Sequence, residues 1–245
     1  MNNQDLQELK NQAYALMEKA GFVLKGDIEV VLDQKLPYMG YTTERDGKPV
    51  IVVSGLTFSS GSTINLVVHE MSHVYRTQSG HPSHDYNLLT TLTAFVVHGR
   101  APEAYQEQIL HTIINHLQDL YADDISFVIF DKISPRPNLG DFFLGWIHEP
   151  LTGAASVEKL WGNADRLLSA AFAQANLKRH HVKDKGRKVE TAVGEFLSKI
   201  DKRTAEKYEF FRDFMIDLPE NPTRKEFEKL LIRYLSEFLK LATIS

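Results

Sequence analysis

The chain of 245 residues contains no cysteine. This absence excludes disulfide bonds, thiolate metal sites and a cysteine nucleophile, so a metal would have to be bound by histidine or carboxylate side chains. No stretch approaches the roughly 18 uninterrupted apolar residues of a membrane-spanning helix, and the first ten residues lack the basic start and apolar core of a signal peptide. We therefore expect a soluble, cytoplasmic protein without a membrane partner.

Neither sign of charge is in strong excess. The formal net charge is −4, and with 43% hydrophobic and 24% charged residues the composition is typical of a globular protein. Residues 1–132 hold 9 Lys and Arg against 16 Asp and Glu, whereas residues 133–245 hold 19 against 16. This balance does not favour nucleic-acid binding. The basic segment 178–188 lacks interleaved aromatic residues and is interpreted as a solvated loop.

Residues 66–75 combine an apolar pattern with two histidines that are four positions apart. On an α-helix, His69 and His73 would lie about 40° apart on one face, so both imidazoles could bind the same ion. Glu70 would point about 100° away from His69, which suits a carboxylate that holds and deprotonates a water molecule instead of binding the metal. The segment therefore predicts a zinc-binding helix.

A second group of ionisable residues lies on one stripe of a later apolar helix. His116, Asp119 and Asp123 follow the spacing i, i+3 and i+7. Ionisable side chains on such a face are costly to bury unless something binds them, and a cation would do so.

The sequence His69-Glu70-Met71-Ser72-His73 resembles the His-Glu-x-x-His signature of the zincin metallopeptidases. The resemblance implies an α+β fold, in which a small sheet precedes the active-site helix and an edge strand, here expected within residues 40–55, pairs with an extended substrate. It also implies one zinc ion per chain bound by the two histidines, with Glu70 as the general base.

The gluzincin branch of that family adds a glutamate ligand from a downstream helix, and four residues later an aspartate that bonds a zinc-bound histidine. The segment Asp119-Leu120-Tyr121-Ala122-Asp123 is similar to this pattern but departs from it at Asp119, which is shorter by one methylene. The resemblance implies that Asp119 is the third metal ligand and that Asp123 orients His69 or His73.

Other residues remain alternative metal ligands. His81, His84 and Asp85 lie in a segment that could fold back over the ion, although loop polarity explains the histidines and helix capping explains Asp85 equally simply. His116 is also an alternative, or a hydrogen-bonded core histidine. Four side chains could stabilise an oxyanion, and the sequence does not rank them: Tyr75, Tyr86, Tyr121 and His148.

The remaining pattern predicts a small sheet followed by helices. Strands are expected at 27–33, 38–43 and 49–54, with a turn at 45–48 and a loop at 55–61. Helices are expected at 3–20, from Ser62 or Thr63 to about 78, and at 84–98, 102–131, 155–177, 187–201, 203–217 and 223–242. We place the catalytic domain in residues 1–132 and a helical subdomain in residues 133–245, joined by a connection at 132–141.

These observations predict a single-zinc metallopeptidase that acts on a peptide or protein. Zinc would lower the pKa of a bound water to about 7, and Glu70 would transfer its proton to the leaving amine. Two alternatives remain open. One is a non-catalytic binding or regulatory module on a zincin scaffold, and the other is a zinc hydrolase of non-peptide amides.

Overall fold

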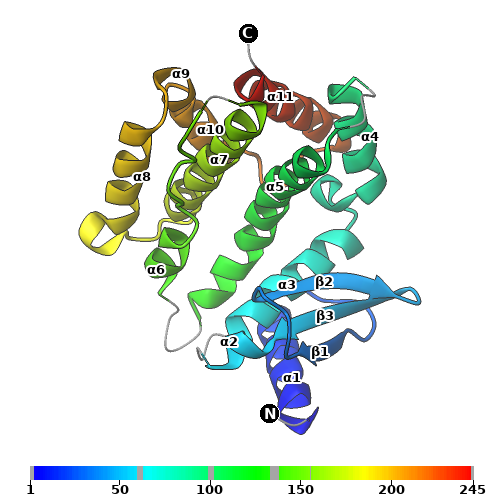
Figure 1. Ribbon diagram of the computed structural model, residues 1–245. Coiled ribbons are helices and arrows are strands. Elements are labelled where there is room, and N and C mark those ends of the chain that lie inside the picture. The colour runs from blue at the N-terminus through cyan, green and yellow to red at the C-terminus, as the bar shows by residue number, and fades with distance from the viewer. Residues whose placement is uncertain (1–2, 60–62, 99–101, 133–137, 155, 244–245) are drawn as a thin grey trace. The chain divides into compact units, whose positions relative to one another are not determined.

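The computed structural model describes residues 3–59, 63–98, 102–132, 138–154 and 156–243 (Figure 1). Internal contacts group the chain into two units. The first comprises Met1–His84 and Tyr121–Pro137, and the second comprises Asp85–Leu120 and Asn138–Ser245. The helix α5, Ala104–Phe130, is continuous through both groups. The predicted domain boundary between residues 132 and 133 stays a prediction, because residues 133–137 lie outside the described part.

The first unit contains a mixed sheet of three strands: β1 (Glu29–Asp33), β2 (Gly40–Arg45) and β3 (Lys48–Ser54). Their order is β1-β3-β2, with β1 parallel and β2 antiparallel to β3. The β2–β3 turn was predicted correctly. Asp46 and Gly47 both have positive φ, 52° and 73°, which is the conformation of a tight hairpin turn.

The expected edge at residues 40–55 is only half right. β2 is an edge strand, but β3 is central because β1 pairs along its other side. Four consecutive buried residues, Val50–Val53, fit this position, since a central strand covered on both faces is apolar throughout.

Two helices cover the sheet of the first unit. α1 (Asn3–Lys19) packs on α3 (Thr63–Gln78), and α3 packs against β2 and β3 (Figure 1). Both helices agree with the predicted ranges, apart from the proposed cap Ser62, which lies outside the described residues. α3 packs against its neighbours through the apolar pattern of residues 66–75. Four of these side chains are almost fully buried: Val67, Val68, Met71 and Val74.

Glycine ends α3 and redirects the chain. Gly80 has a φ of +71°, its N–H donates to the carbonyl of Thr77, and the N–H of His81 donates to the carbonyl of Arg76. This pair of bonds is a Schellman motif, which satisfies the last carbonyls of the helix. The chain then forms a short 3-10 helix, η1 (Pro82–His84).

Two short helices were missed in segments interpreted as loops. α2 (Gly55–Ser59) occupies the expected loop 55–61, and the Ser54 hydroxyl accepts the N–H of Leu56 at its start. α6 (Leu139–Leu144) begins inside the expected connection, and the Asn138 side chain accepts the N–H of Asp141. In both cases a polar side chain at the helix start stabilises a turn too short to show an apolar period.

The second unit is helical. It contains α4 (Tyr86–Val96), the first part of α5, α6, α7 (Val157–Arg179), α8 (Lys188–Lys199), α9 (Lys202–Ala205), α10 (Tyr208–Ile216) and α11 (Arg224–Ala242). α7 packs against α6, α8, α9, α10 and α11, so it is buried on most sides. The single helix predicted at 203–217 is wrong, since the structure divides it into α9 and α10.

The described part of the chain is therefore α+β, as predicted. Among the helices described, none is both long enough and apolar enough to cross a membrane.

Asp165 on α7 provides a test of this packing. Burial raises the pKa of Asp165 from 3.8 to about 6, with Arg166 partly opposing the shift. Because Asp165 ionises at a lower pH in the unfolded chain than in the folded protein, the free energy of unfolding should fall as the pH rises from about 4 to 6. It stays reduced above that range. Asp165→Asn should remove this loss and stabilise the protein at pH 8 by up to about 3 kcal/mol.

The measurement is urea unfolding between pH 4 and pH 8. Asp217→Asn, at an exposed carboxyl, serves as the control and should follow the parent curve. Parallel curves for the parent and Asp165→Asn would contradict the assignment.

Candidate metal centre

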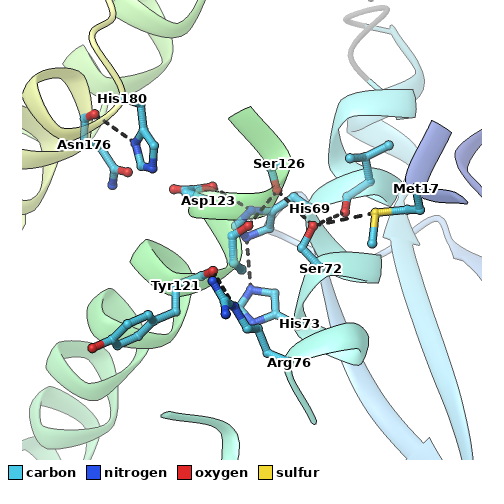
Figure 2. Close-up of polar contacts among 12 residues, drawn as sticks. Met17, His69, Ser72, His73, Arg76, Tyr121, Asp123, Ser126, Asn176 and His180 are labelled. Atoms are coloured by element: carbon cyan, nitrogen blue, oxygen red, sulfur yellow. Dashed lines mark hydrogen bonds and ion pairs between the residues drawn. The ribbon is translucent and has the colours of Figure 1, made fainter. Parts of the chain in front are cut away.

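The α-helical spacing of α3 brings His69 and His73 together. Their Nε2 atoms lie 3.1 Å apart, and the two rings meet edge to face (Figure 2). Two nitrogens bound to one tetrahedral zinc ion at about 2.0–2.1 Å lie about 3.3 Å from each other. The two imidazoles are therefore already spaced as ligands of a single ion.

Asp123 on α5 holds the other ring nitrogen of His69. Its Oδ1 lies 2.9 Å from His69 Nδ1, and its side chain is only 8% exposed (Figure 2). A carboxylate accepts but does not donate, so Nδ1 of His69 carries a proton, and in the neutral imidazole Nε2 presents a lone pair. The sequence pattern predicts this contact, although the role of Asp123 in metal binding stays a prediction.

Asp119 lies one turn before Asp123 on the unbroken helix α5. His69, His73 and Asp119 each offer one ligand atom, and these three atoms all lie within 4.8 Å of one another. Two imidazoles and one carboxylate are a donor set that suits zinc.

Glu70 is directed toward the sheet. Its side chain is buried, and its Oε2 accepts a hydrogen bond of 2.7 Å from the Thr42 hydroxyl on β2. The Thr42 hydroxyl also lies 3.2 Å from the carbonyl oxygen of Glu70. The carboxylate is thus held beside the edge strand of the sheet, and the carboxylate keeps a second oxygen for other contacts.

Two buried serine hydroxyls at the contact between α3 and α5 were not identified from the sequence. The Ser72 hydroxyl donates to the carbonyl of Val68 at 2.8 Å and lies 3.2 Å from the Ser126 hydroxyl of α5 (Figure 2). Both serines are fully buried. Small side chains at this point let the two helix backbones approach closely, which places Asp123 within reach of His69.

Arg76 forms a second link between the helices. Its Nε donates to the carbonyl oxygen of Tyr121 at 2.9 Å, and its guanidinium lies 3.8 Å from Asp124 (Figure 2). This link was not identified from the sequence, where the available signal was a charged residue that follows an apolar helical segment; the structure shows that Arg76 is buried.

His84 and His81 follow α3 in the first unit. Nε2 of His84 lies 2.8 Å from Nδ1 of His73, on the side of the ring opposite to His69. Burial, reinforced by the neighbouring basic side chains of His73, His81 and Arg76, holds the pKa of His84 well below its usual 6.5. The structure therefore places His84 behind a candidate ligand, while its role as an alternative ligand stays untested.

The other alternative ligands have structural roles in the second unit. Asp85 caps α4 by accepting the N–H of Leu88 at 3.0 Å, and it pairs with Arg224. His116 is 1% exposed and stacks on Phe172, with ring centroids 4.9 Å apart. Burial lowers the pKa of His116 to about 4, as expected for a neutral core histidine.

The oxyanion candidates differ in exposure. His148 and Tyr86 are exposed, Tyr75 packs edge to face on Phe22, and Tyr121 is buried beside His81. None of these observations ranks one above the others as an oxyanion donor.

Close packing at Ser72 is open to a direct test. Ser72→Val replaces the hydroxyl with a methyl group and adds a second methyl at a fully buried position, and it should destabilise the protein by about 1–3 kcal/mol. Ser72→Ala removes the hydroxyl without adding bulk, so most of the stability should be retained. Urea unfolding of both variants decides between them, and a Ser72→Val variant as stable as the parent would show that the position is not tightly packed.

No curated protein and no solved structure matches the chain. A family model matches residues 12–240, and this range includes every residue of the candidate metal centre. The chain therefore belongs to the family of unknown function DUF5781.

Proposed function

We propose that this protein is a single-zinc metallohydrolase that cleaves peptide bonds. The observation that carries the proposal is the convergence of three ligand atoms. The Nε2 atoms of His69 and His73 lie 3.1 Å apart, and a carboxylate oxygen of Asp119 lies within 4.8 Å of one ring nitrogen of each histidine.

The number of ligands favours an enzyme. Structural zinc sites are closed by four protein ligands, whereas catalytic sites use three and keep a position for water or substrate. Within the described ranges, the group that could hold an ion comprises three residues. When bound, zinc supplies a Lewis acid that polarises a carbonyl group and makes water more acidic. A non-catalytic module would need a further ligand to close the site.

Glu70 is the proposed general base. It accepts a proton from the attacking water and passes it to the leaving amine. The Thr42 hydroxyl donates to one carboxylate oxygen of Glu70 at 2.7 Å, which orients the group and leaves the second oxygen available for the proton.

The edge strand β2 favours a peptide substrate over a small amide. Among the strands that the structure describes, β2 pairs only with β3, so its outer side can accept an extended peptide as a further strand. The same strand carries Thr42, which contacts Glu70, and two exposed aromatic side chains, Tyr38 and Tyr41, lie before and on it. We also propose that this arrangement of a small sheet and a histidine-bearing helix is zincin-like.

Metal content and hydrolysis together test the proposal. The parent protein should contain about one zinc per chain by elemental analysis, and His73→Ala should lose it. Asp119→Ala should bind zinc more weakly. Zinc retained fully by Asp119→Ala would remove that residue from the ligand set, and a parent that binds no supplied zinc would overturn the metallohydrolase.

A separate pair of variants tests Glu70. Glu70→Gln should keep its zinc and lose about 10²–10⁴-fold of the rate on a quenched fluorescent peptide library. Glu18→Gln, the same replacement at an exposed position on α1, should keep the parent rate. Undiminished hydrolysis by zinc-loaded Glu70→Gln would exclude Glu70 as the base.

A further inference from the structure

A series of hydrogen bonds connects His81, in the turn after α3, to Nδ1 of His73. Nδ1 of His81 lies 2.7 Å from the Ser83 hydroxyl, which lies 2.8 Å from Nδ1 of His84. Nε2 of His84 then lies 2.8 Å from Nδ1 of His73. The Schellman turn at Gly80 begins this arrangement, because it returns the chain alongside the last turns of α3.

The backbone N–H of Ser83 determines which atom is the donor in each of these hydrogen bonds. The N–H of Ser83 donates to Nδ1 of His81 at 3.3 Å, so this nitrogen is an acceptor and carries no proton. The Ser83 hydroxyl, 2.7 Å from the same nitrogen, must therefore be the donor in that contact. Its single proton is then used, and toward His84 it can only accept.

The remaining proton positions follow step by step. His84 donates from Nδ1 to the Ser83 oxygen, and a neutral imidazole protonated at Nδ1 has a lone pair at Nε2. This lone pair accepts the proton on Nδ1 of His73. A second proton on His84 would place a positive charge beside the imidazoles of His73 and His81, whose ring centroids lie 5.1 Å and 6.5 Å away, so the ring is neutral.

The reverse order does not satisfy the same contacts. It would require the Ser83 hydroxyl to donate to His84, and the 2.7 Å contact between Ser83 and His81 would then join two acceptors without a proton. With protons donated from His73 to His84, from His84 to Ser83 and from Ser83 to His81, each of these hydrogen bonds has one proton.

The two candidate ligands therefore present the same nitrogen. Asp123 fixes His69 with its proton on Nδ1, and His84 does the same for His73. When both rings are neutral, their Nε2 atoms, 3.1 Å apart, both present lone pairs, and a cation between them would accept both.

We propose that His84 is a positioning residue that, through Ser83 and His81, fixes His73 in the tautomer whose Nε2 lone pair binds the metal. The metal-binding consequence rests on the proposed function. The tautomer of His73 does not, because the hydrogen bonds that determine it are all within the protein.

The first test is Co²⁺ affinity, measured by the visible absorption of the bound ion. His84→Leu removes the acceptor and should weaken binding about 10- to 100-fold. His84→Gln supplies a side-chain oxygen that can accept the same proton and should restore most of the affinity. His111→Leu, at an exposed histidine of α5, is the control and should bind like the parent.

Circular dichroism and thermal unfolding verify that each variant is folded. If His84→Leu is unstable, Ser83→Ala replaces it, because that variant keeps His84 and removes the link that fixes its proton. Parent-like Co²⁺ affinity in a folded His84→Leu variant would overturn the proposal, as would equal losses in His84→Leu and His84→Gln.

The second test uses metal-free protein and is independent of zinc chemistry. Nitrogen-15 NMR should show His73 protonated at Nδ1 and unprotonated at Nε2. A proton on Nε2 of His73 would contradict the proposed order. If the parent bound no metal but showed the expected tautomer, the metallohydrolase would be overturned, while the assignment of His84 as the residue that fixes the tautomer of His73 would stand.

Discussion

The hydrogen bond between Asp123 and His69 is the interaction on which the candidate site depends. It joins α5 to α3 over 54 positions of sequence and fixes which nitrogen of His69 is available. The close approach that permits it comes from the buried serines Ser72 and Ser126, and the contact of Arg76 with the Tyr121 carbonyl restrains the same pair of helices. Packing and chemistry are thus set by the same few contacts.

The two candidate ligands are oriented by different means. His69 is held by a carboxylate, which adds negative charge beside the site, whereas His73 is held by a neutral imidazole. A carboxylate partner makes a histidine more basic than a neutral partner does, so His69 is expected to donate its electron pair to a metal more strongly than His73. The centre therefore has two similar ligands in unequal environments.

Part of this structure could be predicted from the sequence because it is local. The spacing of His69 and His73 on one helix determines their convergence, and the apolar pattern determines which face of α3 is buried. The position of Asp123 followed from helical spacing together with a family pattern. The hairpin turn at Asp46 and Gly47 was equally readable, since few residues adopt positive φ.

What could not be predicted depends on contacts between distant segments or on very short elements. The parallel pairing of β1 with β3, which makes β3 central, has no local signal. The placement of His84 behind His73 depends on the turn at Gly80, and from the sequence His84 was interpreted as an alternative ligand or an ordinary loop histidine. α2 and α6 are too short for their periodicity to be recognised.

The donor set of the candidate centre has a consequence for its chemical durability. All of its candidate ligand atoms are imidazole nitrogens or carboxylate oxygens, and the chain has no cysteine. Peroxide and disulfide reagents release zinc from thiolate sites by oxidising sulfur, and here they have no sulfur ligand to attack. A metal held by these residues would be released by acid, because protons compete for the same lone pairs, and would persist under oxidising conditions.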